Sequence, residues 1–219
     1  MQNSNEVQPT LKNSTVGRIL FFLFLALFSG LAISVPFMYP SMTLWYKVGL
    51  NGILLQTGQV FGLLAMLLVC LQLLASGRPS FLVKLFGLSM LMRFHRMNSV
   101  AIFLLALGHV LLVLGPEGFA NLPIGMKYWP EMVGALLFSV ISFLFFFSWF
   151  RDQLGVSYPR WRTIHKPLGY GALLLLFLHV RFVSDSFTHL VPQAGLYLLF
   201  LVVACVLVGA KYSSRWLRR

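Results

Sequence analysis

Six apolar segments, each long enough to cross a lipid bilayer as a helix, constrain the fold of this chain more than any other feature. A transmembrane helix needs about 20 predominantly apolar residues to cross a hydrocarbon core of roughly 30 Å. The connections between the segments are short, which leaves no room for a soluble domain between them. The sequence therefore predicts an all-α integral membrane bundle of six helices. The predicted spans cover approximately residues 19–38, 53–75, 95–115, 131–150, 165–187 and 194–212.

The composition agrees with a membrane bundle. Apolar residues make up 58% of the chain and charged residues only 10%, which is outside the range of a soluble domain. The net charge of +12 does not indicate nucleic acid binding, because the basic residues are not clustered on one face. We expect a cytoplasmic N-terminal segment over 1–18, a membrane domain over 19–212 and a basic cytoplasmic tail over 213–219. The first apolar run lacks a small-residue cleavage site, so we expect it to remain in the membrane.

The positions of the basic residues predict the orientation of the bundle. If the N-terminus is cytoplasmic, 14 of the 17 lysines and arginines lie on the inner side. Only Lys47, Lys127 and Arg181 then lie outside. Such an excess of cytoplasmic positive charge is the usual rule for membrane proteins. We therefore expect a multi-pass protein of the plasma (inner) membrane with both termini in the cytoplasm.

Two histidines lie in the third apolar segment and two in the fifth, with the same spacing in both. His95 and His109 belong to "FHRMNSVAIFLLALGHVLL", and His165 and His179 to "WRTIHKPLGYGALLLLFLHVRF". Fourteen residues span about 21 Å of helix and return to within about 40° of the same face. Both segments are odd-numbered and so run outward in parallel. We expect His95 to lie level with His165 near the inner surface, and His109 level with His179 further out.

Two paired imidazoles at each level predict two haems. An iron porphyrin with two axial imidazoles is six-coordinate, which suits electron transfer because no ligand has to leave or enter. A single membrane histidine is more often a polar contact between helices, but such a contact requires neither equal spacing nor two parallel helices. Covalent haem attachment is not expected, because the chain has no C-x-x-C-H motif. We therefore predict two molecules of b-type haem.

Basic residues close to the predicted ligands are candidate partners of the haem propionates. Arg96, Arg162 and Lys166 flank the inner histidines, although basic residues also occur at this interface for topological reasons. Arg181 is two residues past His179 on the outer side. Its side chain could hold a propionate, attract an anionic acceptor or form an ion pair with Asp185 one turn later.

Small residues in the spans have two interpretations each. Gly108, Gly169 and Gly171 lie close to predicted ligands, where a missing side chain would let a flat ring or a neighbouring helix approach the backbone. Cys70 and Cys205 have no metal or redox spacing. We expect both cysteines to be small core residues.

Four short stretches resemble one known family. They are "GRPSFLVKLFGLSMLMRFHR" before and into the third span, "GH" at 108–109, "WRTIH" at the entry to the fifth span and "LH" at 178–179. With these features, the region from about residue 50 to 212 resembles the ferric reductase-like transmembrane domain family. That family includes the haem domains of NADPH oxidases and ferric-chelate reductases, and the haem subunit of a bacterial periplasmic methionine sulfoxide reductase system.

The resemblance implies a direction of electron flow and a set of partners. The family's haem ligands match His95 with His165 and His109 with His179. Electrons would pass from a cytoplasmic flavoprotein, carrying FAD or FMN, through the inner and outer haems to an external acceptor. Many members continue into flavin and nicotinamide domains, whereas this chain ends at "KYSSRWLRR" without a glycine-rich phosphate loop. We therefore expect a separate cytoplasmic flavin reductase as donor.

Several alternatives stay open on the sequence alone. The complete set of four histidines favours the oxidase and ferric reductase branch, because the sulfoxide reductase subunit has a basic residue where this chain has His95. The chain length favours that subunit, which passes quinol or flavin electrons to a periplasmic acceptor protein. An ascorbate-reducible cytochrome is disfavoured, since it draws four histidines from four helices. A haem-free transporter or scaffold is the remaining alternative.

Overall fold

The fold is helical throughout the part of the chain that the structure describes. The structure is a computed structural model and describes residues 7–40, 48–118, 122 and 124–216. Within these residues there is no β-strand. Seven α-helices and three short 3-10 helices follow one another in the described part of the chain. They are α1 (Val7–Met38), α2 (Gly49–Gly77), α3 (Ser80–Phe86), α4 (Leu88–Leu114), η1 (Gly115–Glu117), η2 (Met126–Tyr128), α5 (Trp129–Trp149), α6 (Tyr158–Val183), η3 (Asp185–Thr188) and α7 (Leu190–Trp216).

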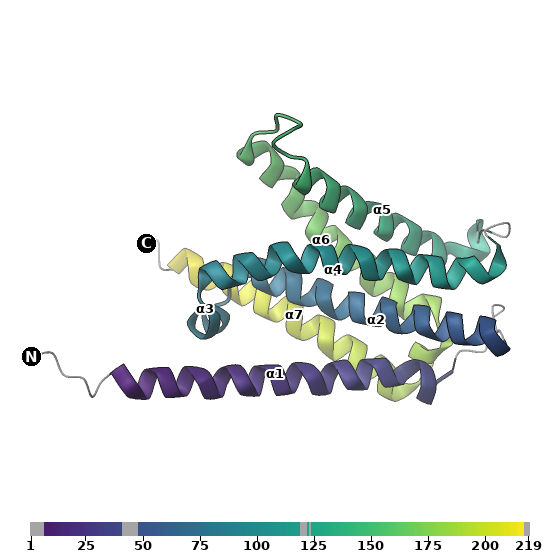
Figure 1. Ribbon diagram of the computed structural model, residues 1–219, viewed down its shortest axis with the longest axis horizontal. Coiled ribbons are helices and arrows are strands. Elements are labelled where there is room, and N and C mark those ends of the chain that lie inside the picture. The colour runs from purple at the N-terminus through teal and green to yellow at the C-terminus, as the bar shows by residue number, and fades with distance from the viewer. Residues whose placement is uncertain (1–6, 41–47, 119–121, 123, 217–219) are drawn as a thin grey trace, which may run out of the picture.

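Six of these helices are long and apolar enough to cross a membrane, which confirms the predicted six-helix bundle. They are α1, α2, α4, α5, α6 and α7. Helices suit this environment because their backbone groups are hydrogen-bonded within the segment, where lipid offers no partners. In Figure 1, the start of α1, the short helix α3 and the end of α7 all lie at one end of the bundle. We call this the termini end. The tail residues 217–219 and Lys47, included in the sequence predictions, are outside the described residues.

All six long helices begin before the spans that hydropathy predicts, and for the histidine positions the starts of α4 and α6 matter. α4 begins at Leu88 and α6 at Tyr158, each seven residues before the predicted start of its apolar span. Basic side chains can occupy these first turns because long stems carry the charges to the membrane surface. His95 and His165 therefore lie about two turns inside their helices, and the prediction that they stand at the helix starts is wrong. The short helix α3, which is followed by Gly87 with a φ of 78°, was also not predicted.

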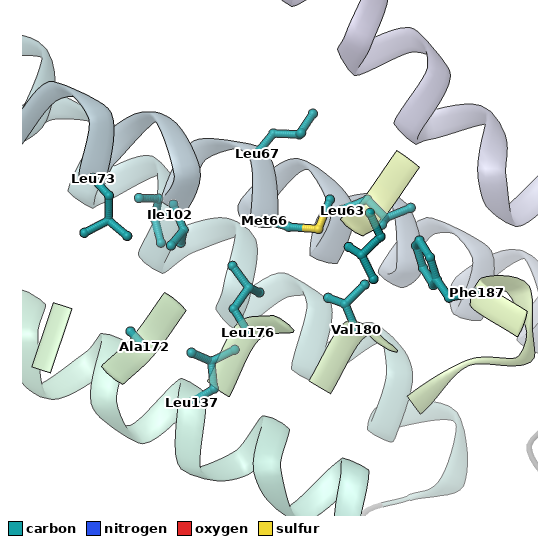
Figure 2. Close-up of a cluster of buried hydrophobic side chains, with 12 residues drawn as sticks. Leu63, Met66, Leu67, Leu73, Ile102, Leu137, Ala172, Leu176, Val180 and Phe187 are labelled. Atoms are coloured by element: carbon teal, nitrogen blue, oxygen red, sulfur yellow. The ribbon is translucent and has the colours of Figure 1, made fainter. Parts of the chain in front are cut away.

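The bundle is organised around α2. This helix packs most extensively against α4 and also contacts α1 and α7, while α5 packs against α6. A cluster of buried apolar side chains joins these groups and includes Met66 of α2, Ile102 of α4, Leu137 of α5 and Leu176 of α6 (Figure 2). Lipid is as apolar as these side chains, so close van der Waals packing rather than transfer from water stabilises the contact. Three residues of this cluster, Ile102 of α4 and Ala172 and Leu176 of α6, lie between the histidine positions of their helices.

The two cysteines have different environments. Cys70 of α2 is buried, as expected for a small core residue. Cys205 of α7 is exposed, so the prediction that it belongs to the core is wrong. The core-facing side of α7 is marked by Val203, which is 1% exposed. Two residues turn a helix by about 200°, which places Cys205 on the opposite face.

Candidate haem-binding site

The four histidines of α4 and α6 form two facing pairs. The ring centroids of His95 and His165 are 6.3 Å apart, with 64° between the ring planes. Those of His109 and His179 are 6.2 Å apart, at 74°. All four side chains are half-buried. Because the earlier histidine of one helix faces the earlier histidine of the other, α4 and α6 run parallel.

The spacing within each pair is that of two imidazoles sharing one metal ion. A metal–imidazole nitrogen bond is about 2 Å long. With ring bonds of about 1.33 Å, each nitrogen lies about 1.1 Å from the centre of its five-membered ring. Two imidazoles on opposite sides of one ion therefore have centroids about 6.2 Å apart. Both observed separations, 6.3 Å and 6.2 Å, agree with this value.

The outer histidines have their Nδ1 atoms held by backbone carbonyls. Nδ1 of His109 is 2.8 Å from the Gly58 carbonyl oxygen of α2. Nδ1 of His179 is 2.9 Å from the Pro130 carbonyl oxygen of α5. A carbonyl can only accept a hydrogen bond, so each Nδ1 carries the proton and donates it. The lone pair of each Nε2 is then free to bind a metal ion, the usual arrangement for metal-binding histidines.

A polar network between α2 and α4 holds the inner ligand His95. Its Nδ1 is 3.3 Å from the Gln72 carbonyl oxygen, and the Gln72 side-chain amide donates to the His95 carbonyl at 2.8 Å. Asn98, only 4% exposed, donates to the Gln72 side-chain oxygen and to the Leu68 carbonyl, both at 2.9 Å. Buried amides are costly unless they are paired. This network therefore fixes α2 against α4 at the level of His95.

The fourth ligand candidate, His165, has a side-chain partner instead. Its Nδ1 is 3.2 Å from the Ser148 hydroxyl oxygen of α5. The indole Nε1 of Trp161 donates to the same oxygen at 3.2 Å. The Trp161 ring also stacks on the imidazole, with centroids 4.5 Å apart and 28° between the planes. His165 is thus oriented by α5 and by its own helix.

Two glycines make room for the outer imidazoles. A Cβ at Gly62 of α2 would stand 2.9 Å from Nδ1 of His109, and one at Gly134 of α5 would overlap the ring of His179. In each case the carbonyl that accepts from the imidazole lies four residues earlier on the same helix. Sequence reasoning missed both glycines. The small-residue pattern G-x-x-x-G over 58–62 could have indicated the first, but no local pattern marks the second.

The glycines singled out from the sequence have other surroundings. A Cβ at Gly108 would meet the Phe61 ring at 2.7 Å, so this glycine allows α4 to approach α2. A Cβ at Gly169 would make an ordinary contact with Leu73 at 3.7 Å. Nothing lies within 4 Å of a Cβ at Gly171. Helix contact, the second interpretation, therefore describes Gly108.

The candidate basic residues lie at both ends of the histidine helices. Arg96, Arg162 and Lys166 are exposed and lie within one turn of the inner pair. Arg181 donates from Nε to the Tyr197 hydroxyl of α7 at 3.0 Å, and its guanidinium lies over the Phe182 ring. Two residues correspond to about 200° of helix rotation. Arg181 thus faces α7, on the side of α6 away from His179.

The donor set suits haem better than a free metal ion. No group of three or more His, Cys, Asp or Glu side chains gathers within the described ranges. Two imidazoles alone do not complete the coordination of a free ion, whereas a porphyrin supplies four further nitrogens. Between the histidine levels, Phe103 of α4 stacks on Phe145 of α5 with centroids 4.7 Å apart. The residues present therefore fit two bis-histidine haems in an apolar surrounding.

Comparison with known proteins supplies the family. The model of the ferric reductase like transmembrane component family matches residues 61–176, more than half of the chain. The match contains His95, His109 and His165, while His179 lies three residues beyond it. No curated protein and no solved structure gives a significant match. Membership implies an oxidoreductase role in electron transfer across a membrane. The chain belongs to the family of ferric reductase like transmembrane components.

Proposed function

We propose that the chain carries electrons across the membrane by holding two b-type haems, one between His95 and His165 and one between His109 and His179. The observation that carries this proposal is the ring separation of 6.3 Å and 6.2 Å in the two pairs, which is the separation expected around one metal ion. Bound there, each haem would take up and release one electron without a change of ligands.

The residues of the chain have three tasks in this proposal. The carbonyls of Gly58, Gln72 and Pro130, together with the Ser148 hydroxyl, orient the imidazoles from behind. The fourteen-residue spacing places the two levels about 21 Å apart along the helices. The apolar cluster and the phenylalanine stack between the levels exclude water, which keeps the site in a medium of low polarity.

The proposed direction is from the cytoplasm outward. The excess of basic residues favours the termini end as the cytoplasmic end. A separate cytoplasmic flavin reductase, with FAD or FMN, would deliver electrons at the level of His95 and His165. An acceptor outside would take them at the level of His109 and His179. Ferric chelates, oxygen and a periplasmic protein such as a methionine sulfoxide reductase are the acceptor classes to be compared.

The basic residues have separate roles in the proposal. Arg96, Arg162 and Lys166 lie close enough in sequence to the inner ligands to pair the propionates of the inner haem. The place of Arg181 beside Tyr197 favours attraction of an anionic acceptor over a propionate contact.

The test is the colour and haem content of the purified full chain in lipid nanodiscs. We expect a b-type absorption spectrum, reversible reduction and two haems per chain, extractable with acidified acetone. The variant His189→Ala is a matched control, because this exposed histidine belongs to neither pair and its loss should leave two haems. A well-folded chain that binds no haem would overturn the proposal and leave a haem-free transporter or scaffold as the better account.

The acceptor is tested in sealed vesicles that contain a flavin reductase and a nicotinamide donor inside. Impermeant ferric chelate, oxygen and a periplasmic sulfoxide reductase are offered outside in turn. We expect the internal nicotinamide to be oxidised, through the reductase and then the chain, only when one of these acceptors is present. Oxidation that does not depend on any external acceptor would contradict electron transfer across the membrane.

A further inference from the structure

His165 differs from the other three histidines in the kind of group that meets its Nδ1. The other three face backbone carbonyls, which can only accept a hydrogen bond. Ser148 offers a hydroxyl, which can both donate and accept. The strength of the bond at His165 therefore depends on what else the hydroxyl does.

Trp161 is the second partner of that hydroxyl, and stacking on both neighbouring rings fixes the orientation of its indole. The indole ring stacks on His165, with centroids 4.5 Å apart, and on Tyr158, with centroids 5.5 Å apart and 30° between the planes. Tyr158 is 53% exposed, so it forms the outer layer of this stack. The stack keeps the Trp161 N–H directed at the Ser148 oxygen, 3.2 Å away.

We propose, building on the proposed haem function, that Ser148 and Trp161 are positioning residues that set the reduction potential of the inner haem through Nδ1 of His165. A hydrogen bond from Nδ1 makes a ligating imidazole more basic. A more basic ligand favours ferric iron and lowers the potential, and such outer hydrogen bonds are among the means by which proteins set haem potentials. The outer haem has carbonyl partners and is not subject to this control.

The two residues act on His165 in opposite directions. The Ser148 oxygen accepts from Nδ1 and lowers the potential. The Trp161 N–H draws on the same oxygen, which makes that oxygen a poorer acceptor for His165 and raises the potential. Trp161 therefore acts through Ser148, and its effect requires the hydroxyl to be present.

The experiment is redox potentiometry of the full chain in nanodiscs, followed at the haem absorption band. The inner component is the one that is lost in His165→Ala. We expect Ser148→Ala to raise the potential of this component and Trp161→Phe, which keeps a stacking ring, to lower it. Each shift corresponds to a change of up to about tenfold in the reduction equilibrium, or ~59 mV for one electron. The double variant should have the same potential as Ser148→Ala alone, because Trp161 acts on His165 only through the Ser148 oxygen, which that variant lacks.

Two matched control residues, Ser139 and Trp149, lie on α5, the helix that carries Ser148. The Ser139 hydroxyl donates to the Ala135 carbonyl of its own helix, and Trp149 is 59% exposed. Ser139→Ala and Trp149→Phe should leave both potentials unchanged. Shifts of the same sign in Ser148→Ala and Trp161→Phe, an equal shift of the outer component, or no shift at all would overturn the inference.

Two further outcomes are distinguishable. If Ser148→Ala loses the inner haem, Ser148→Thr, which restores the hydroxyl, should retain it at the original potential, and loss in both variants would overturn the inference. A wild-type chain that binds no haem would contradict the proposed function itself. Two bound haems whose potentials do not change in the Ser148 and Trp161 variants would contradict only this inference.

Discussion

Gly62 and His109 approach each other so closely across the contact of α2 and α4 that a single methyl group would separate them. A Cβ at position 62 would stand 2.9 Å from Nδ1 of the imidazole, and Nδ1 itself is 2.8 Å from the carbonyl one turn earlier on α2. The ring has little freedom to yield without losing that hydrogen bond. The absence of a side chain at Gly62 is thus part of how His109 is placed.

We expect Gly62→Ala to reduce the occupancy of the outer haem and to leave the inner haem in place. Overpacking costs about 1–3 kcal/mol, which corresponds to roughly 5- to 160-fold weaker haem binding. Haem per chain after purification, measured over a series of haem concentrations, gives the change. Gly171→Ala is the control, because nothing lies within 4 Å of a Cβ there. Equal haem loss in both variants would show that the contact at Gly62 has no special role.

Replacing one outer ligand should remove one haem and not both. His179→Ala leaves His109 without a partner, but the two pairs share no residue. We therefore expect the haem content to fall from two to one per chain. The absorption spectrum should show that the outer haem is the one lost. His165→Ala should give the reciprocal result. A folded variant that lost both haems to the same extent would argue against two independent sites.

Asn98→Ala should weaken the contact of α2 and α4 and disturb the inner pair. The change leaves the Leu68 carbonyl and the Gln72 side-chain oxygen without this donor. Hydrogen bonds between membrane helices are worth about 0.6 kcal/mol on average and up to about 1.7 kcal/mol. We expect a loss of about 1 kcal/mol in unfolding free energy in mixed micelles. Ser99→Ala, whose hydroxyl bonds only within its own helix at Arg96, should cost less; the opposite order would contradict the assigned role.

Turnover should move charge across the membrane. The two histidine levels are about 21 Å apart along the helices, and moving one charge across the whole membrane involves roughly 2.3 kcal/mol per 100 mV. Outward electron transfer should therefore slow as the vesicle interior becomes positive. With donor inside and an impermeant acceptor outside, an ionophore should raise the steady-state rate. If transfer between the levels is rate-limiting and the ionophore has no effect, the two sites do not lie at different depths.

Much of the architecture could be predicted from the sequence because it depends on local properties. Six apolar runs of bilayer length predict six helices, since lipid leaves backbone groups no other partners. The fourteen-residue spacing within α4 and α6 predicts one histidine face on each helix, because helix geometry is nearly constant. The helix starts at Leu88 and Tyr158 were not predictable in this way. Hydropathy detects where apolar residues begin, whereas charged side chains can join a helix and still reach the surface.

Only the tertiary structure determined which group forms a hydrogen bond with Nδ1 of each imidazole. Apolar helices in lipid can pack through many similar faces, so their rotation and partners depend on close contacts between particular residues rather than on hydropathy. Only the packed bundle brings the carbonyls of Gly58 and Pro130 to His109 and His179, and only it pairs Ser148 with His165. These partners come from other helices, 51, 49 and 17 residues away in the sequence. No local pattern encodes contacts at such separations, because they arise from how the helices pack.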